Sequence, residues 1–176
     1  MKGAPVVDFL LVGGGLASAT AAETLRAAGT DGSIAILCAE NTLPYYRPPL
    51  SKEFLLKGPG QTKIFIHDHS FYRDRDIEIH LGSRVRRVDV DSRVIETDAG
   101  DHFRFGKLLI ASGASVHKLS LPGANLEGIH YLRTVSDART RCIKLLPMRG
   151  ERSSWERASS EWRLRPLSQL GESQRR

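Results

Sequence analysis

The chain is organised around the stretch Phe9-Leu-Leu-Val-Gly-Gly-Gly-Leu-Ala-Ser-Ala-Thr-Ala-Ala-Glu-Thr-Leu-Arg26. An apolar run over residues 6–12 is interrupted only by Asp8 and leads straight into three glycines. An alanine-rich segment follows as far as Gly29. A short apolar run that ends in glycines is typical of a buried strand and a tight turn, and alanine favours a helix. The stretch therefore predicts a strand, a turn and a helix in that order.

The glycines have the spacing of a dinucleotide-binding fingerprint. Gly13 stands where the tight turn needs a glycine, and Gly15 stands where the backbone must approach a pyrophosphate. The free N–H groups at the start of the following helix would bind the phosphates. The third fingerprint position is Ser18 instead of glycine or alanine, although serine is small enough to keep helix and strand close. Glycine turns after strands are common, so this motif alone is weak evidence.

An acidic residue downstream strengthens the motif. Residues 33–39 predict a second strand, which ends at Glu40. A carboxylate at a strand end, roughly 20 to 30 residues past the glycines, is placed to accept hydrogen bonds from a ribose 2′-OH. The two features together favour a dinucleotide site over the alternative, a plain strand–helix–strand unit in which the carboxylate only caps a helix.

Composition indicates one soluble domain. The chain has 176 residues, 40% of them apolar. No apolar run approaches the roughly 20 residues of a membrane-spanning helix. The short apolar run near the N-terminus is interrupted by the glycine turn, which argues against a signal peptide. Two isolated cysteines, Cys38 and Cys142, suggest a reducing compartment, and we expect a cytoplasmic protein.

The positive charge is confined to one end of the chain. Residues 1–138 carry 16 basic and 16 acidic side chains, whereas residues 139–176 carry ten and four, so the net charge of +6 comes from the second segment. A basic stretch can bind nucleic acid or an anionic membrane. Because this one has no amphipathic periodicity and no nucleic-acid-binding motif, a solvated tail is favoured.

A proline loop, Arg47-Pro-Pro-Leu-Ser-Lys52, follows the Glu40 strand. Its prolines predict an extended, rigid path, and Ser51 is a candidate N-cap for a short helix that Gly58-Pro59-Gly60 ends. The loop would hold the cations of Arg47 and Lys52 just past the dinucleotide site. Composition alone allows equally that both cations are solvated on the surface.

The next segment predicts one helix and several short strands joined by turns. The helix is expected over residues 69–76, the strands of a β-meander over 77–81, 84–90 and 94–97, and a buried return strand over 108–111. A small-residue turn, Ser112-Gly113, ends the return strand. Three histidines, His67, His69 and His80, span a helix and a strand without carboxylate or cysteine support, so no metal site is expected.

These ordered motifs resemble the FAD-binding half of ferredoxin and rubredoxin reductases, which belong to the flavoprotein reductases with two dinucleotide-binding domains. The resemblance covers about residues 5–138. It implies an α/β, Rossmann-like FAD-binding domain over residues 1–138, with a parallel sheet and a β-meander insertion. Residues 139–176 are then a basic tail, irregular and non-native or disordered.

The resemblance also implies roles for individual residues. In this family the arginine and lysine of the proline loop lie beside the flavin, and those roles fall here to Arg47 and Lys52. The return strand of the family passes close to FAD, here at Ala111, Ser112 and Gly113. The remaining cofactor-binding positions, on the pyrophosphate and ribose side, are Gly13, Gly15, Ser18 and Glu40. The family usually has an acidic or amide residue before the arginine, where this chain has Tyr46.

The activity that the resemblance implies is electron transfer through FAD. NAD(P)H would reduce the flavin, and a small iron–sulfur carrier, ferredoxin or rubredoxin, would accept the electrons. No membrane or nucleic-acid partner is expected. No residue is expected to act as a catalytic acid, base or nucleophile, because the cofactor carries the chemistry.

The end of the chain departs from the family. A valine-rich strand and a second glycine fingerprint for NAD(P)H would be expected after residue 138, but Trp155, Trp162 and nine arginines appear instead. The codons permit a frame offset by two bases to spell Gly-x-Gly-Phe-Ile-Gly-Met-Glu-Val-Ala-Ala across this region. We therefore predict a frameshift after Ala138, an incomplete FAD-binding domain, and weak or no activity of the chain alone.

Three other functions stay open on the residues alone. The chain could be a non-catalytic FAD-binding module, an NAD-binding dehydrogenase domain, since the fingerprint does not separate NAD from FAD, or a nucleic-acid binder that uses the basic tail. A flavin spectrum would separate the first of these from the other two. Bleaching of that spectrum by NADH would separate a reductase from a non-catalytic module.

Overall fold

The computed structural model describes residues 4–57 and 63–145. The strands are β1 (Val6–Val12), β2 (Ile34–Leu37), β3 (Ile77–His80), β4 (Val85–Asp89), β5 (Val94–Thr97) and β6 (His102–Ile110). The helices are α1 (Leu16–Ala27), the 3₁₀ turn η1 (Pro48–Ser51), α2 (Glu53–Lys57), α3 (His69–Arg73) and α4 (Val135–Leu145). The predicted out-of-frame tail beyond Leu145, with Trp155 and Trp162, lies outside the described residues.

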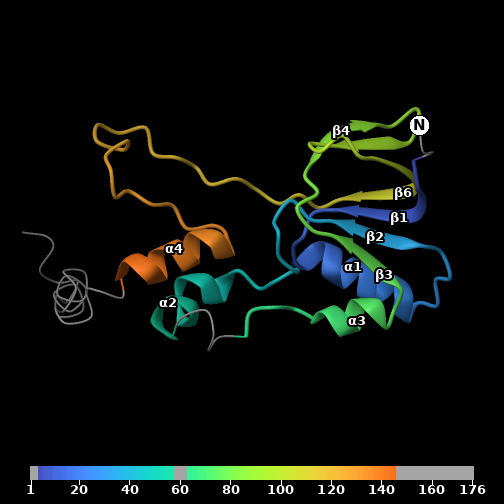
Figure 1. The fold of residues 1–176 in the computed structure, drawn as a ribbon, viewed down its shortest axis with the longest axis horizontal. Coiled ribbons are helices and arrows are strands. Elements are labelled where there is room, and N and C mark those ends of the chain that lie inside the picture. Colours follow the sequence, from blue (N-terminus) through green and yellow to red (C-terminus); the bar gives the residue numbers. More distant parts are fainter. Residues whose placement is uncertain (1–3, 58–62, 146–176) are drawn as a thin grey trace, which may run out of the picture.

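All six strands form one sheet in the order β3-β2-β1-β6-β5-β4 (Figure 1). β1 pairs in parallel with both β2 and β6, and β2 pairs in parallel with β3. Every residue of β2 is buried, as expected for a strand in a parallel sheet that is covered on both faces. The Rossmann-like class of fold is thereby confirmed, and so is the strand–turn–helix order at the start of the chain.

One predicted strand has a different place in the sheet. Residues 77–81 were expected in the meander, but β3 pairs in parallel with β2 and forms the edge of the main sheet. A parallel neighbour needs a long crossover connection. The segment from Cys38 to Asp76, which contains α2 and α3, provides it. The antiparallel meander therefore consists only of β4, β5 and the first part of β6.

The return strand is longer and more exposed than predicted. β6 pairs antiparallel with β5 through residues 102–104 and parallel with β1 along most of its length. Beyond that point no described strand pairs with its outer edge. Leu109 is 38% exposed and Ile110 is 62% exposed, so the expectation of a buried strand at 108–111 is wrong. Apolar character alone could not show that this part of the strand has only one neighbour.

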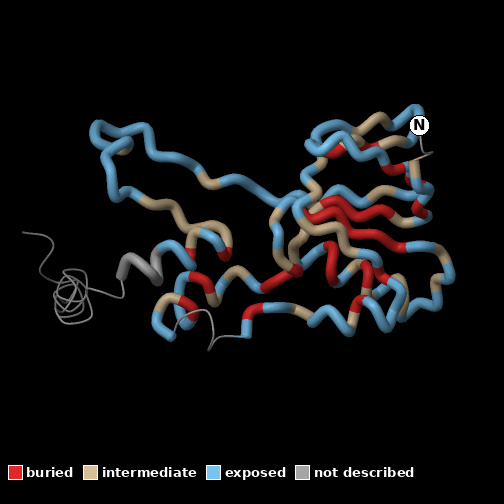
Figure 2. The backbone as a smooth tube through the Cα atoms, viewed as in Figure 1, coloured by how far each residue is buried: buried red, intermediate tan, exposed pale blue. Residues whose placement is uncertain are grey.

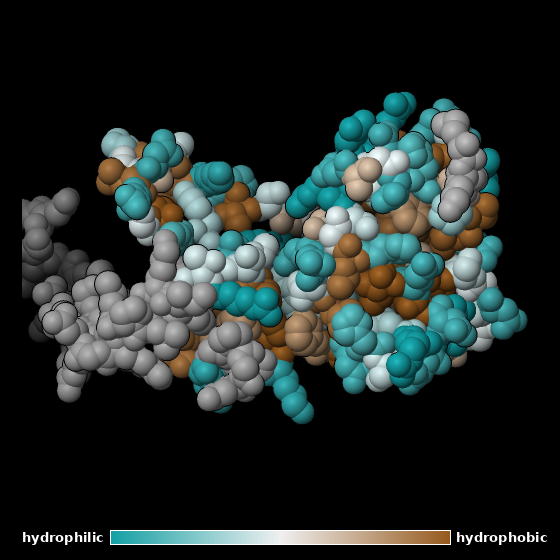
Figure 3. Space-filling view, in the orientation of Figure 1, coloured by the Kyte–Doolittle hydropathy of each residue, from teal (hydrophilic) through white to brown (hydrophobic). Residues whose placement is uncertain are grey.

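The two faces of the sheet are covered by different elements. One face packs against α1 and α3 through an apolar cluster around Leu11, Ile36 and Tyr72. The other face packs against the meander, where Ile95 and Phe103 meet residues of β1 and β2. Figure 2 shows that many of the buried residues lie in the central strands β1 and β2 and in α1. The long segment between β6 and α4 is mostly exposed. That segment carries the exposed apolar residues Leu119, Leu121, Leu126 and Ile129 (Figure 3).

A small helical module stands beside the sheet. η1, α2 and α4 share their own apolar cluster, which contains Tyr45, Leu50, Phe54, Ile64, Val135 and Ala138. Ser51 does not cap a helix as predicted, because its hydroxyl donates to the carbonyl of Pro48 at 3.4 Å and α2 begins only at Glu53. α4 runs across the domain boundary predicted at residue 138, and that division of the chain stays a prediction.

Candidate dinucleotide-binding site

The glycine turn after β1 lies between the ends of β2 and β6. Gly13 has φ +125°, which favours glycine, and its N–H donates to the Leu37 carbonyl at 2.9 Å. A Cβ atom at this position would collide with the carbonyl oxygen of Ala111. The protein's own packing therefore requires glycine at position 13. The turn lies at the carboxyl edge of the sheet. There β1 has β2 on one side and β6 on the other, so the chain leaves the strands in two directions.

Gly15, two residues later, has no such constraint from the protein. Its backbone is extended, with φ −109° and ψ −174°, and an added Cβ would meet no protein atom within 4 Å. It is the N-cap of α1, and it has no side chain with which to bind the first N–H groups of the helix. The start of α1 is therefore accessible to a group that approaches the backbone.

The first turn of α1 packs tightly on the sheet. Ser18 is fully buried, and its hydroxyl has no hydrogen-bond partner among the described residues. Ala19 and Ala22 are also completely buried. A Cβ at Gly14 would lie 2.9 Å from the Cβ and Sγ atoms of Cys38 on the chain leaving β2. Small side chains at these positions let the helix begin close to the ends of β1 and β2.

Glu40 lies just past β2 and is held by two neighbours. Its Oε2 accepts a hydrogen bond from the Tyr45 hydroxyl at 2.8 Å, and its Oε1 lies 3.8 Å from Nη2 of Arg47. The Glu40 side chain is 30% exposed. Burial, followed by the hydrogen bond to Glu40, raises the pKa of Tyr45 to about 12, so that hydroxyl keeps its proton at neutral pH. Glu40 and Arg47, separate in the sequence, thus meet at the same place.

The two cations of the proline loop differ in their surroundings. Arg47 precedes η1 and makes the ion pair with Glu40. Lys52 follows η1 and is exposed, and no side-chain contact between it and another predicted site residue is recorded over the described ranges. Arg47 therefore lies beside Glu40, just past the end of β2, whereas Lys52 lies on the surface of the helical module.

The end of β6 completes the carboxyl edge. Ala111 donates its N–H to the Val12 carbonyl at 2.8 Å, which places this residue beside the glycine turn. Ser112 and Gly113 are exposed, and Gly113 has φ +75°. A Cβ on Gly113 would lie 3.6 Å from Nη2 of Arg133, whose Nε atom is buried without a partner among the described residues. An arginine that the sequence did not single out therefore faces the predicted turn.

A family model named pyridine nucleotide-disulphide oxidoreductase matches residues 7–153. The chain belongs to this family. The match contains the glycine turn, Glu40, the proline loop and the end of β6.

Individual relatives are named as reductases of ferredoxin or rubredoxin. The chain is 43% identical over 138 residues to a ferredoxin–NAD(P)⁺ reductase of a Sphingomonas species, an alignment that covers 78% of this chain and 33% of the relative. It is 37% identical to a rubredoxin–NAD⁺ reductase of Pseudomonas putida, with coverage of 78% and 36%. The chain thus spans about a third of the length of these relatives.

Solved structures of the family have the same fold. The ferredoxin reductase for the CYP199A2 system of Rhodopseudomonas palustris superposes with a TM-score of 0.73 at 32% identity, over 80% of this chain and 35% of that one. The NADH:rubredoxin oxidoreductase of Clostridium acetobutylicum superposes with a TM-score of 0.71 at 24% identity, over 81% and 36%. The second likeness concerns the fold alone.

Three residues near the site were missed from the sequence. Cys38 leaves no room for a side chain at Gly14, and the Tyr45 hydroxyl donates a hydrogen bond to Glu40. The Arg133 guanidinium lies close to Gly113. Arg133 lies 20 residues after Gly113 in the chain, and no local pattern connects the two. Tyr45 could have been predicted as a site residue, because it follows Glu40 by only five residues. An aromatic side chain is equally typical of a hydrophobic core, however, so the sequence does not decide its role.

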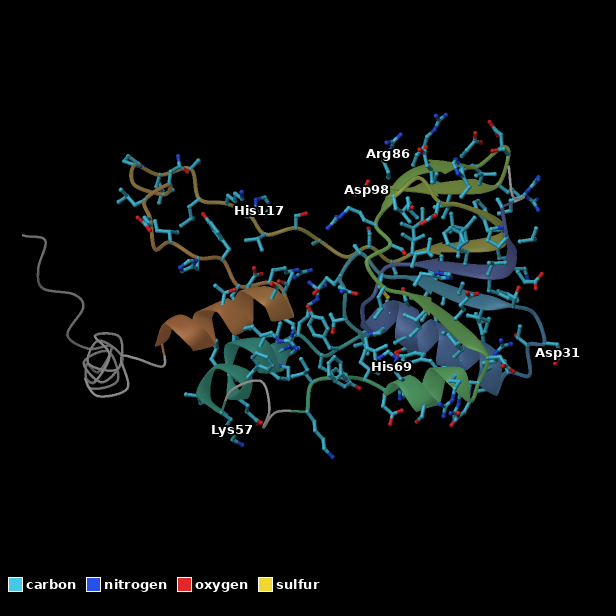
Figure 4. All side chains as sticks on the ribbon, in the orientation of Figure 1. Asp31, Lys57, His69, Arg86, Asp98 and His117 are labelled. Atoms are coloured by element: carbon cyan, nitrogen blue, oxygen red, sulfur yellow. The ribbon has the colours of Figure 1, made fainter. Side chains whose placement is uncertain are left out.

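Other chemistry finds no support in the described residues. No three histidine, cysteine or acidic side chains gather there as a metal site, and His69 and His117 lie in separate parts of the molecule (Figure 4). Burial, and then the charge of Glu40, raise the pKa of the Cys38 thiol to about 12, so it is not a nucleophile at neutral pH. None of the helices described is long and apolar enough to cross a membrane.

Proposed function

We propose that the chain binds FAD at the carboxyl edge of its sheet, as the FAD-binding part of an NAD(P)H-dependent reductase of the ferredoxin and rubredoxin type. The observation that carries this proposal is the contrast between two glycines in one turn. Packing against Ala111 requires Gly13, whereas nothing in the described protein requires Gly15. A glycine that the fold does not need, at the open start of a helix, suits close approach by a pyrophosphate.

The residues around the turn fit the two polar parts of FAD on this side. The N–H groups at the start of α1 would bind the pyrophosphate, and Ser18 would keep the helix close to the sheet. Glu40 would accept hydrogen bonds from the adenosine ribose. Arg133 would add a positive charge near the phosphates, since its Nε lacks a partner among the described residues.

The flavin end would lie towards the helical module. We assign Lys52 to this end, with Ala111, Ser112 and Gly113 forming the wall beside it. The resemblance implies the same end for Arg47, but its ion pair with Glu40 places the Arg47 guanidinium nearer to the proposed ribose position. When bound, FAD would supply the redox chemistry by accepting a hydride from NAD(P)H and passing on single electrons. The protein's contribution would be to orient the ring, to exclude water from one side and to place positive charge near it.

The electron donor and acceptor follow from the relatives. Their names indicate NAD(P)H as donor and ferredoxin or rubredoxin as acceptor, so we propose a small iron–sulfur carrier as the partner. The printed sequence shows only one glycine fingerprint. Because hydride transfer requires the nicotinamide to be positioned against the flavin, we expect NADH oxidation by this chain alone to be near background.

FAD titration of the purified chain tests the proposal. The matched variants are Gly15→Leu, which fills the open position at the start of α1, and Ala28→Leu, which adds the same side chain at the exposed far end of that helix. We expect the parent and A28L to bind FAD, with the red-shifted absorbance of a bound flavin, and G15L to lose at least about a hundredfold in affinity. Equal binding by all three would place the site elsewhere.

NAD⁺ titration and NADH oxidation separate the alternatives. NAD⁺ binding at the same site without FAD binding would indicate a dehydrogenase domain. FAD binding without reduction by NADH is the result expected for this chain alone. A turnover on the order of 10 per second, typical of enzymes, would show that a pyridine-nucleotide site has been missed.

A further inference from the structure

The hydroxyl of Tyr45 joins the end of β2 to the start of α4. It donates to Oε2 of Glu40 at 2.8 Å and accepts a hydrogen bond from the N–H of Val135 at 3.2 Å. Val135 is the first residue of α4, whose initial N–H groups have no partner within the helix. One buried oxygen atom therefore connects the carboxylate at the sheet edge to the helical module.

The position of this hydroxyl is fixed on several sides. Tyr45 is only 3% exposed, and its ring packs in the cluster with Leu50, Phe54, Ile64 and Ala138. The backbone on both sides of the residue is held by hydrogen bonds from Tyr46 to the Ile64 carbonyl at 2.8 Å and from Ile66 to the Pro44 carbonyl at 3.0 Å. The tyrosine is thus a rigid part of the module and not a surface side chain that happens to reach Glu40.

The start of α4 is rigid as well. Thr134 and Asp137 form a capping box, in which the Thr134 hydroxyl accepts from the Asp137 N–H at 3.1 Å and the Asp137 carboxylate accepts from the Thr134 N–H at 2.8 Å. The Asp137 carboxylate also accepts from the Arg133 N–H at 3.0 Å. The Val135 N–H is therefore presented to Tyr45 by a well-ordered helix start.

Glu40 depends on this support. A glutamate past a strand end has three rotatable side-chain bonds, and holding them in one arrangement costs conformational entropy. Apart from Tyr45, the described contact of its carboxylate is the 3.8 Å approach of Arg47, which is too long for a hydrogen bond. A carboxylate has about four lone-pair sites, so Tyr45 can hold Oε2 while other lone pairs accept from a ribose.

We propose that Tyr45 is the positioning residue that gives Glu40 its selectivity for the adenosine ribose 2′-OH, using the start of α4 as its anchor. This inference rests on the proposed FAD site. Fixing the carboxylate before the ligand arrives removes the entropy cost at binding. Discrimination between ligands with and without the 2′-OH then depends on a residue that need not touch the ligand.

A purely structural role for Tyr45 predicts something different. If its hydroxyl served only to satisfy the Val135 N–H, its removal would weaken the module and lower the affinity for every ligand by the same factor. The ratio of affinities for two ligands that differ only in the 2′-OH would then be unchanged. That ratio is therefore the decisive measurement.

The experiment compares the binding of FAD with that of its 2′-deoxyadenosine analogue by fluorescence titration of the full chain. The test variant is Tyr45→Phe, which keeps the ring and removes the hydroxyl. The control is Thr97→Ala, which removes a buried hydroxyl that accepts from the Asp101 N–H at 3.1 Å and leaves Tyr45, Glu40 and the start of α4 unchanged. We expect the parent and T97A to prefer FAD about tenfold, the size of one hydrogen bond to a charged group, and Y45F to prefer it by less than about threefold.

The possible outcomes separate this inference from the proposed function. A parent that binds FAD with the tenfold preference, and a folded Y45F that keeps this preference, would overturn the inference and leave the FAD site standing. Loss of the preference in T97A as well would assign the effect to overall stability and also overturn it. A parent that binds neither ligand would overturn both proposals.

A second variant keeps the test decisive if Y45F does not fold. Val135→Pro leaves Tyr45 and Glu40 unchanged but removes the N–H that anchors the Tyr45 hydroxyl, at the first position of α4, where proline is favoured. We expect V135P to lose part of the preference for FAD over the deoxy analogue. Full preference in a folded V135P would show that selectivity does not need the anchor at the start of α4.

Discussion

The polar groups at the two ends of the parallel strands differ in whether they have hydrogen-bond partners within the protein. At the amino ends of the strands, near Asp31 in Figure 4, polar groups bind one another. Arg26 donates to four backbone carbonyls, those of Thr30, Gly32, Arg75 and Asp76, at 2.7–2.8 Å. Asp8 accepts from both the N–H and the hydroxyl of Ser33, each at 2.8 Å. At this end of the sheet the hydrogen bonds of Arg26 and Asp8 are made within the protein itself.

At the carboxyl ends, several groups have no such partner among the described residues. The position beside Gly15 is open, and the Ser18 hydroxyl and the Arg133 Nε are unpartnered. A buried polar group without a partner reduces stability. The amino end therefore contributes to stability, whereas under the proposed function the carboxyl end serves a ligand, so substitutions at the two ends should affect different measurements.

The largest effect on stability is expected at the carboxyl end of the sheet, at Gly13, where a Cβ would collide with backbone. Gly13→Ala should lower the free energy of unfolding by at least about 3 kcal/mol or prevent folding, because it combines a left-handed backbone with a collision against the Ala111 carbonyl. Gly15→Ala should change it by less than about 0.5 kcal/mol, since its Cβ meets open space. Urea unfolding followed by circular dichroism measures both.

This pair of glycine variants tests the comparison directly. FAD affinity should fall clearly in G15A even though its stability is unchanged. Equal stabilities of G13A and G15A would mean that the turn does not pack against β6 as the structure shows.

The next largest effect is expected at the amino end. Arg26→Met should lower the free energy of unfolding by about 2–3 kcal/mol, because it leaves carbonyl groups on two loops without their donor. The control is Arg73→Met, whose side chain is 79% exposed and pairs only with the adjacent Asp74, and its effect should stay within about 0.5 kcal/mol. FAD affinity in folded R26M should match the parent; a selective loss of binding would contradict the assignment of this end to stability.

A smaller effect of opposite sign is expected at Ser18. Ser18→Ala removes a fully buried hydroxyl without a recorded partner and should raise the free energy of unfolding by about 1 kcal/mol. Thr97→Ala is the matched control, because the Thr97 hydroxyl is equally buried but accepts a hydrogen bond from the Asp101 N–H at 3.1 Å. T97A should be destabilised by about 1 kcal/mol. Destabilisation of S18A would reveal a partner for its hydroxyl.

The smallest effect concerns acid sensitivity at Asp8. Hydrogen bonds from the Ser33 side chain, and then from its backbone, lower the pKa of Asp8 below the ordinary value of 3.8. Their contribution to stability is therefore present above about pH 4 and is lost as the pH falls through the lowered pKa. The difference in urea midpoint between the parent and Asp8→Asn should be largest near pH 6 and should shrink towards pH 3. Ser33→Ala should show part of the same trend, and a constant difference in both variants would contradict it.

Local patterns were sufficient for the first half of the fold. The apolar run, the glycines and the alanine-rich segment predicted β1, the turn and α1, because each is a short-range consequence of side-chain size and backbone freedom. The spacing of Gly13, Glu40 and the proline loop also predicted that these residues serve one site. In the structure Gly13 and Glu40 follow two neighbouring parallel strands, and Arg47 lies beside Glu40; that these residues serve one site stays a prediction.

Contacts between distant segments were not available from the sequence. The pairing of β3 with β2, the exposed outer edge of β6, the Tyr45 hydroxyl on Glu40 and Arg133 over Gly113 all join segments that no short-range pattern connects. Periodicity indicates which residues are apolar, but it does not indicate which neighbour covers them. The two glycines of the turn illustrate this limit, because only the position of the Ala111 carbonyl shows that the fold needs glycine at position 13, whereas a Cβ at Gly15 would meet no described neighbour.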